Sequence, residues 1–303
     1  MMKPKLAERL WQCFQNQEEF TLQEAYASEP DMPKESVRAR IYENLGIRFE
    51  KIARGVYSIK GQKENCILLE GDGRDLSFLK AESIDCIITD HPWLDQKSNH
   101  GGNREFANYD CFRYTEQDFR EKARVLKEGS FLVEILPEEN SSNFEYLYEV
   151  KKMAEKAGFI YYSKVPWKKG SFVSNTGRKA KNTQDIMIFS KGKARSLRPD
   201  KKKMKRLGEE MFMSGVNGIL PVCFDIEPVK KAGRIHQSEM PCDLLEKIIA
   251  FVTIQGEIIL DQFAGSGVVG EAALRMKRSC ILIEKLRENV KNIQKRFQKL
   301  VYV

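Results

Sequence analysis

A glycine-rich loop at residues 265–270 constrains the fold of this chain more than any other feature. Gly265, Gly267 and Gly270 match the pattern G-x-G-x-x-G between an apolar strand and an apolar helix. Glycine lets the backbone pass close to a nucleotide, and an acid such as Glu284, at the end of the next strand, can accept hydrogen bonds from ribose hydroxyls. The loop therefore predicts a nucleotide-binding α/β sheet, and by itself it suits a dinucleotide equally well.

The position of this loop in the chain separates two kinds of nucleotide-binding protein. Residues 271–303 suffice for one helix, one strand and one more helix. A nucleotide-binding sheet needs more strands than that, so the others must come from upstream. A dehydrogenase would normally begin its nucleotide domain with this loop. The chain order therefore disfavours a nicotinamide oxidoreductase.

From residue 66 onward, short apolar strands alternate with helices, as in a largely parallel sheet covered on both faces. The predicted strands lie at 66–70, 84–89, 131–136, 159–164, 183–190, 258–260 and 280–283. The predicted helices lie at 76–81, 115–126, 143–157, 241–252, 268–276 and 287–300. The segment 191–235 is basic, lacks a clear period and is interpreted as a linker or a recognition insert.

The first 61 residues have a different texture. They contain a helix at 5–14, a short helix that Thr21 and Glu24 can cap, and a third helix that ends at Gly46. Two alternating strands then surround residues 53–55, which is a hairpin signal. Three helices and a hairpin resemble a winged helix-turn-helix domain. The alternative is a small packing module that touches no nucleic acid.

The charge balance favours a polyanionic partner. The chain carries 51 lysines and arginines against 43 aspartates and glutamates, a net charge of +8, and such an excess steers association with nucleic acid. Many basic proteins bind no nucleic acid, so the location of the charge matters more. Basic residues gather at 34–54, at 164–206 and in the last helix, where a solvated helix face is the simpler explanation.

Composition also excludes several classes of protein. No apolar stretch is long enough to span a membrane, and the N-terminus lacks the features of a secretory signal, so we expect a cytoplasmic protein. The seven cysteines are scattered without C-x-x-C spacing, and the chain has three histidines. Neither a disulfide framework nor a metal site is indicated.

The stretch Asp90-His91-Pro92-Trp93 places an acid, a proline and an indole at the end of a buried strand. It is similar to the D-P-P-[YFW] catalytic motif of amino-group DNA methyltransferases. Residues 261–267 resemble the D-x-F-x-G-S-G cofactor loop of the same enzymes, which use S-adenosylmethionine. The order, with the catalytic motif first and the cofactor loop last, is that of their permuted beta group.

Three further stretches match this family, and the resemblance spans residues 66–295. They are Gly71–Asp72 upstream of the catalytic motif, His236–Pro241 ahead of the last helix-strand-loop unit, and Val165–Lys168 before the strand at 183. Each motif is common by itself, but five in the right order rarely arise by accident.

The resemblance implies the fold and the domain organisation. We expect an α/β fold of the Rossmann-like class I methyltransferase type, with a mostly parallel seven-stranded sheet and a circularly permuted motif order. This methyltransferase domain would cover residues 62–303, with a recognition insert at about 191–235. The winged-helix-like domain would cover residues 1–61.

The resemblance also implies a site-specific DNA methyltransferase that acts on adenine N6 of a flipped base. An exocyclic amino group is a poor nucleophile because its lone pair is delocalised into the ring. The Asp90 carboxylate and the backbone carbonyl of His91 would accept hydrogen bonds from it, while Trp93 stacks on the base. Pro92 biases His91 toward extended geometry, which can turn that carbonyl into the pocket.

The remaining predicted site residues fall into two groups. The predicted S-adenosylmethionine-binding residues are Asp72, His236, Ser238, Asp261, Phe263, Ala264, Gly265, Gly267 and Glu284. The predicted nucleic-acid-binding residues are Arg38, Arg40, Lys51, Arg54, Lys168, Arg178, Lys179, Lys201 and Lys202.

Two positions depart from the family pattern. His91 stands where proline is usual, and Met240 stands where lysine is frequent. These departures keep open a DNA-binding regulator with an inactive methyltransferase fold, beside cytosine-N4 DNA methylation and adenine-N6 RNA methylation. The partner we expect is double-stranded DNA. The sequence leaves open whether the protein forms a homodimer and whether it has a cognate restriction endonuclease.

Overall fold

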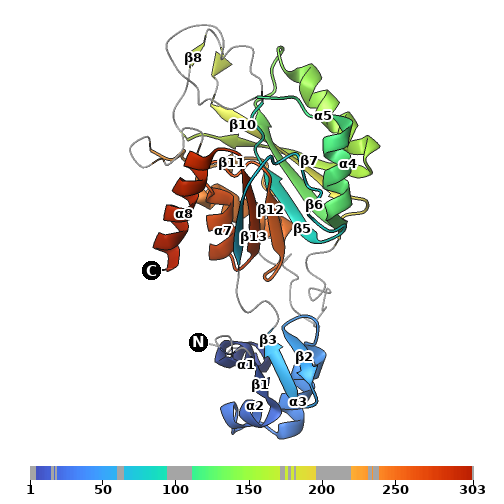
Figure 1. Ribbon diagram of the computed structural model, residues 1–303, viewed down its shortest axis with the longest axis vertical. Coiled ribbons are helices and arrows are strands. Elements are labelled where there is room, and N and C mark those ends of the chain that lie inside the picture. The colour runs from blue at the N-terminus through green and yellow to red at the C-terminus, as the bar shows by residue number, and fades with distance from the viewer. Residues whose placement is uncertain are drawn as a thin grey trace, which may run out of the picture. The chain divides into compact units, whose positions relative to one another are not determined.

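The computed structural model describes residues 5–14, 17, 19–59, 65–93, 111–170, 175–176, 179–180, 182–195, 220–230, 234 and 239–301. The chain divides into two compact units, Met1–Glu64 and Asn65–Val303 (Figure 1). Each unit has its own buried core, so each is described by itself. No helix in the described ranges is long and apolar enough to cross a membrane.

The first unit combines three helices with a three-stranded antiparallel sheet. Its elements are α1 (Leu6–Phe14), β1 (Phe20–Thr21), α2 (Leu22–Ser28), α3 (Lys34–Glu43), β2 (Phe49–Ala53) and β3 (Val56–Ile59). The sheet order is β1-β3-β2. The predicted capping box of α2 is confirmed, because the Thr21 hydroxyl accepts the Glu24 N–H and the Thr21 N–H donates to the Glu24 carboxylate.

Aromatic side chains build the core of the first unit. The rings of Phe14 and Phe20 stack with centroids 4.3 Å apart, and Phe49 and Tyr57 pack against Phe20. Phe20 also pairs with Tyr57 through β1, a two-residue strand that is too short to have a periodic signal in the sequence. This packing joins the helices to the hairpin in one core.

The second unit contains an eight-stranded sheet with the order β11-β7-β10-β6-β5-β12-β13-β4. The strands are β4 (Cys66–Glu70), β5 (Ile84–Thr89), β6 (Leu126–Pro137), β7 (Phe159–Lys168), β10 (Thr183–Lys191), β11 (Phe224–Asp225), β12 (Ile258–Asp261) and β13 (Ser279–Glu284). Among the described strands of this sheet, β10 alone runs antiparallel to its neighbours, so the sheet is mostly parallel, as predicted. One strand more than predicted is present, because β11 pairs with the end of β7. A separate hairpin joins β8 (Asn175–Thr176) and β9 (Lys179–Ala180).

Helices cover both faces of this sheet (Figure 1). The helices are α4 (Glu116–Val125), α5 (Phe144–Lys156), α6 (Cys242–Val252), α7 (Val268–Arg275) and α8 (Arg287–Val301). Side chains of α4 and α5 share one core with one face of the sheet, and side chains of α6, α7 and α8 share another core with the opposite face. The central strand β5 is buried along its whole length and contributes to both cores.

The prediction of a helix at 76–81 is wrong. This segment forms turns, in which the Asp75 carboxylate accepts the Ser77 N–H at 2.9 Å. Such a local side-chain bond gives the backbone an alternative to a helix. Strand β6 begins at Leu126, earlier than predicted, and passes through Gly129 at a φ of +74°.

Two neighbouring strands bring the predicted motifs together. Strands β5 and β12 run parallel, with Cys86 opposite Ile259 and Ile87 opposite Leu260. The carboxyl ends of parallel strands lie at the same edge of a sheet, and in open α/β sheets ligands bind at that edge. Asp90 follows β5 and Asp261 ends β12, so these two acids lie at one edge.

Candidate active site

Asp90 and Asp261 are joined through Thr89, the last residue of β5. The Thr89 hydroxyl donates to the Asp261 carboxylate at 3.2 Å, across a separation of 172 residues in the chain. Asp261 also accepts the backbone N–H of Phe263 at 3.1 Å. The end of the strand that carries the D-H-P-W motif is therefore bonded directly to the start of the glycine loop.

The two carboxylates have similar electrostatics. Burial raises the pKa of Asp90 to about 7, while the positive charge of Lys169 and a hydrogen bond from the Trp93 side chain lower it. Burial also raises the pKa of Asp261 to about 7, and the negative charge of Asp90 adds to that rise. The pKa values of neighbouring acids influence each other in this way only at short range. Both groups therefore titrate near neutral pH.

Glu284 holds the glycine loop in place. One of its carboxylate oxygens accepts the Gly265 N–H and the other accepts the Leu286 N–H, both at 2.8 Å. With respect to the part of the chain that the structure describes, each oxygen keeps a second lone pair, so bonds to ribose hydroxyls stay a prediction that this geometry permits. The Ala264 N–H donates to the carbonyl of Ile283 at 3.0 Å, which fastens the loop to the end of β13.

Gly267 has a packing role of its own. Its φ is +75°, and a Cβ at this position would lie 2.9 Å from Cγ2 of Ile293 in α8. A larger residue would therefore strain the backbone and push α8 away. Close approach of Gly267 to a nucleotide, which the sequence pattern suggested, stays a prediction.

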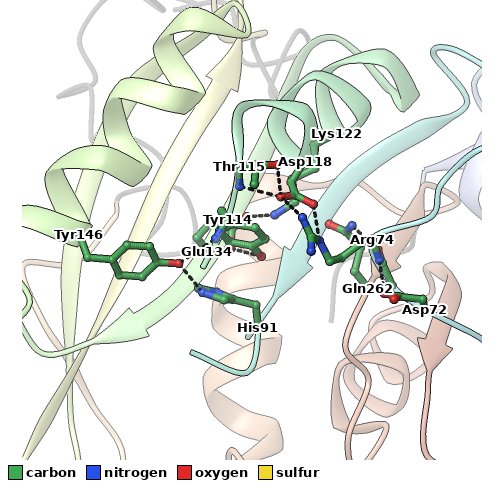
Figure 2. Close-up of polar contacts among 11 residues, drawn as sticks. Asp72, Arg74, His91, Tyr114, Thr115, Asp118, Lys122, Glu134, Tyr146 and Gln262 are labelled. Carbon is green, nitrogen blue, oxygen red and sulfur yellow. Dashed lines mark hydrogen bonds and ion pairs between the residues drawn. The ribbon is translucent and has the colours of Figure 1, made fainter. Parts of the chain in front are cut away.

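The segment after β4 lies against the cofactor loop. A Cβ on Gly73 would lie 1.9 Å from the backbone oxygen of Gln262, and the Gln262 amide donates to the Gly73 carbonyl at 2.6 Å. The neighbouring Asp72 is exposed and accepts the Arg74 N–H at 3.0 Å (Figure 2). The structure thus brings Asp72 beside residues 261–265, although 189 residues separate Gly73 from Gln262.

One buried polar atom at this junction lacks a partner among the residues that the structure describes. It is Oε1 of Gln262, whose side chain is otherwise held by Gly73. A buried acceptor without a donor is unfavourable. An added ligand with an N–H or O–H group at this place would satisfy it.

The side chain of His91 is directed toward Tyr146 of α5. Its ring is buried, and Nε2 lies 2.7 Å from the Tyr146 hydroxyl (Figure 2). The backbone carbonyl of the next residue, Pro92, accepts the Phe112 N–H at 3.0 Å. The ring of Phe112 lies 5.4 Å from that of Phe263, between centroids. Phe112 therefore contacts both the predicted catalytic motif, through Pro92, and the predicted cofactor loop, through Phe263. Trp93 is partly buried and packs against the core that α4 and α5 share with one face of the sheet.

The sequence did not predict a buried ion pair that is linked through Tyr114 to the residues around His91. Lys122 of α4 and Glu134 of β6 are both fully buried and paired, and the Tyr114 hydroxyl donates to Glu134 at 3.0 Å (Figure 2). Burial lowers the pKa of Lys122 and raises that of Glu134, and each partner opposes the shift of the other. A glutamate inside the apolar run 131–136 was the available signal, because such a charge needs a buried partner.

Lys169 is a second residue that the sequence reasoning missed. Its backbone N–H donates to the Asn182 carbonyl at 2.7 Å, and its ammonium lies 5.1 Å from the centre of the Trp167 ring. Burial lowers its pKa, while the negative charges of Asp90 and Glu138 raise it. Lys169 is thus the cation whose charge acts on Asp90, whereas the predicted basic residue was its neighbour Lys168.

Comparison with known proteins supports the interpretation of the motifs. The family model described as DNA methylase (N6_N4_Mtase) matches residues 84–295, more than half of the chain. The chain belongs to this family. Membership confirms the family that the motifs predicted, an amino-group DNA methyltransferase that uses S-adenosylmethionine.

The relatives and solved structures agree with this family. The chain is 28% identical over 252 residues to the type II methyltransferase M2.LlaDCHI of Lactococcus lactis subsp. cremoris, covering 78% of this chain and 91% of that protein. It is similar in fold to the M1.HpyAVI–SAM complex, with a TM-score of 0.53 at 20% identity over 77% of this chain and 98% of that one. It also resembles the cytosine-N4-specific PvuII DNA methyltransferase, with a TM-score of 0.54 at 20% identity over 77% and 86% of the two chains.

The departure at Met240 has a packing explanation. Met240 is buried in the core formed with α6, α7 and α8, where an ammonium group would lose its solvation. The neighbouring Glu239 forms a buried ion pair with Arg296 of α8. In this methyltransferase Met240 therefore contributes to the hydrophobic core.

The predicted nucleic-acid-binding residues lie in several places. Arg38 and Arg40 are exposed on α3, Lys51 is exposed on β2, and Arg54 lies in the turn before β3. Arg40 is paired with Glu43 on the same helix.

Lys168 donates to Asp225 of β11 at 2.8 Å, and the backbone of Lys179 lies in β9. Arg178, Lys201, Lys202, His236 and Ser238 lie outside the described residues, as does most of the segment 191–235.

Proposed function

We propose that this protein transfers a methyl group from S-adenosylmethionine to N6 of adenine at a fixed sequence in double-stranded DNA. The observation that carries the proposal is the bonded junction between the end of β5, with Asp90, and the start of the glycine loop, with Asp261. An aspartate at the first position of the motif resembles the adenine enzymes of the family, which is the reason for choosing adenine over cytosine.

The residues of the predicted cofactor site fit S-adenosylmethionine. The loop 264–267 carries glycines at positive φ, Gly265 at +52° and Gly267 at +75°. Among the described residues, each Glu284 oxygen accepts one bond and keeps a lone pair for a ribose hydroxyl, and Oε1 of Gln262 beside the loop has no donor. Asp72 lies on the adjoining segment. When bound, the cofactor supplies a sulfonium methyl group that is ready to be attacked.

In this proposal Asp90 activates the amino group that is methylated. Its ionised carboxylate accepts a hydrogen bond from the amino group, which draws the nitrogen toward tetrahedral geometry and frees its lone pair. The carbonyl of His91 accepts the second amino hydrogen, and Trp93 stacks on the base. With the methyl donor bound, the nitrogen would gain a bond to the methyl carbon as the carbon–sulfur bond breaks, and Asp90 would pass one amino proton to water.

The remaining contribution to the rate is positional. Asp90 and the carbonyl of His91 would hold the amino nitrogen in line with the bond that breaks. A bimolecular reaction then becomes effectively unimolecular, which lowers its entropic cost. Lys169 supports the ionised form of Asp90 through its charge. The reaction involves no group that is bound covalently to the protein.

We further propose that the first unit is a winged-helix-like DNA-binding domain. Its support is the exposed basic side chains of Arg38 and Arg40 on α3 and of Lys51 and Arg54 on the β2–β3 hairpin. A helix and a hairpin are the two elements with which such domains contact a groove and a flanking backbone.

Labelled methyl transfer tests the function. The purified protein is incubated with radiolabelled S-adenosylmethionine and genomic DNA that lacks methylation, and the nucleosides are separated. Label in N6-methyladenine that disappears in Asp90→Ala supports the proposal. Label in N4-methylcytosine would assign the enzyme to the other base of its family, label only with RNA would change the substrate, and no label on any substrate would favour a regulator.

A further inference from the structure

The side chain of His91 is buried and hydrogen-bonded, although the predicted role of this residue uses only its backbone. The ring is 1% exposed, and Nε2 lies 2.7 Å from the hydroxyl of Tyr146, 55 residues further along the chain. Its other ring nitrogen, Nδ1, has no partner among the described residues. Within them, the bond to Tyr146 is the polar anchor of the ring.

Aromatic rings enclose the imidazole from several sides. The centroid of the His91 ring lies 4.0 Å from that of Tyr114, 5.5 Å from that of Phe112 and 6.0 Å from that of Tyr146. The Tyr114 N–H also donates to the Tyr146 hydroxyl at 3.4 Å. The motif, the segment 112–114 and helix α5 therefore meet at one hydroxyl group.

The protonation states keep this hydrogen bond intact near neutral pH. Burial lowers the pKa of His91 well below its usual range, and the charge of Lys122 lowers it further. Burial also raises the pKa of Tyr146. The imidazole is therefore neutral and the phenol protonated. The hydrogen bond between Nε2 and the Tyr146 hydroxyl thus joins two uncharged groups.

We propose that Tyr146 is a positioning residue for methyl transfer. Its hydroxyl, acting through the His91 ring, fixes the peptide between Asp90 and Pro92, so that the Asp90 carboxylate and the His91 carbonyl keep their direction. A proline at position 91 would fix φ covalently. In this chain the bond to α5 replaces that covalent restraint. The inference rests on the proposed function for the identity of the reaction.

Steady-state kinetics of Tyr146→Phe are the first test. The variant keeps the ring and removes only the hydroxyl, so we expect kcat to fall about tenfold through loss of alignment. KM for DNA and for S-adenosylmethionine should stay within about twofold, since neither ligand contacts α5 in the proposal. The matched control is Tyr148→Phe, an exposed tyrosine on the same helix, which should match the wild type.

A double-mutant comparison separates positioning from a general loss of packing. His91→Phe keeps an aromatic ring and lacks Nε2, and His91→Pro supplies the covalent restraint. In either background Tyr146→Phe should change kcat by less than about twofold, because the bond is already absent. The same tenfold loss in both backgrounds would overturn the proposal, as would wild-type kcat in Tyr146→Phe alone.

Hydrogen exchange tests the anchor without reference to activity. Exchange of the peptide that spans residues 87–93 should be faster in Tyr146→Phe than in the wild type and unchanged in Tyr148→Phe. Equal exchange in all three proteins would refute the anchor even if activity fell. A wild-type protein that transfers no methyl group would refute the proposed function, while this exchange measurement would still decide whether Tyr146 restrains the motif.

Discussion

The aspartates at the ends of β5 and β12 have the same shifted pKa and opposite surroundings. Asp261 accepts bonds from the Thr89 hydroxyl and the Phe263 N–H, both at its oxygen Oδ1. Asp90 faces the Trp93 side chain and the charge of Lys169. A carboxylate has lone pairs for about four bonds. Among the described residues, Asp90 accepts a side-chain bond from Trp93, whereas Asp261 accepts two bonds. We propose that Asp261 holds the site together and that Asp90 acts in the reaction.

Removal of the Asp90 carboxylate should have the largest effect. We expect Asp90→Ala to lower kcat for methyl transfer about 100- to 1,000-fold, because the acceptor that activates the amino group is lost. Calorimetric affinity for S-adenosylmethionine should stay within about twofold. Asp243→Ala, an exposed acid on α6, is the control that should retain full activity. A comparable loss of cofactor affinity in Asp90→Ala would erase the distinction between the two acids.

Removal of the Asp261 carboxylate should act on binding and folding. Asp261→Ala leaves the Thr89 hydroxyl and the Phe263 N–H without their acceptor, which lowers the unfolding free energy by roughly 1–3 kcal/mol. We expect cofactor affinity to fall about tenfold, since the loop loses its anchor. Thr89→Val removes one of the two bonds and should give a smaller loss of both quantities. Unchanged affinity in Asp261→Ala would contradict a building role.

The pH dependence of the rate should follow Asp90. Its pKa is about 7 and the ionised form is the acceptor, so kcat should rise about tenfold per pH unit below this value and level off above it. In Asp90→Asn the residual rate should lose this rise. A wild-type profile that is flat between pH 5.5 and 8, which are on the order of one unit either side of the pKa, would remove Asp90 from this role.

Stability should change with pH in the opposite direction. The folded pKa values of Asp90 and Asp261 lie above their ordinary value of 3.8, so the folded state binds protons more tightly than the unfolded state. Their contribution to stability is present below about pH 4 and is lost as pH rises through about 7. Urea unfolding should therefore give Asp90→Asn a shallower decline than the wild type over this window. An identical decline would show that another group carries it.

Removal of the Lys169 charge should have the smallest effect. Lys169→Met raises the pKa of Asp90 further, so the midpoint of the rate profile should move upward by less than about one unit. The rate near pH 7 should fall about threefold. Lys152→Met removes one exposed charge from α5 and serves as the control for net charge. A downward shift, or equal shifts in both variants, would rule out a specific contact.

Much of the fold follows from local patterns in the sequence. The strands at 84–89 and 258–260 are apolar runs, and Thr21 with Glu24 has the spacing of a capping box, so their prediction needs no knowledge of distant residues. The prediction of a helix at 76–81 was wrong because a hydrogen bond from the Ser77 N–H to the Asp75 carboxylate favours turns over a weak apolar pattern.

The site is harder to predict, because its contacts join residues far apart. The fit of Gly73 under Gln262 and the bond from His91 to Tyr146 depend on the packing of separate elements. No spacing in the sequence reveals such a pair. The sequence assigns His91 a role through its backbone carbonyl and marks it as a departure from proline, whereas its side-chain partner on α5 depends on the fold.

The most direct test of this account is a crystal structure of the protein with S-adenosylmethionine bound. We expect the cofactor to lie along loop 264–267 with its sulfonium methyl directed toward the Asp90 carboxylate, and the space between them to admit a purine ring. A methyl group directed away from Asp90, or a carboxylate too close to the sulfur for a base to enter, would contradict it.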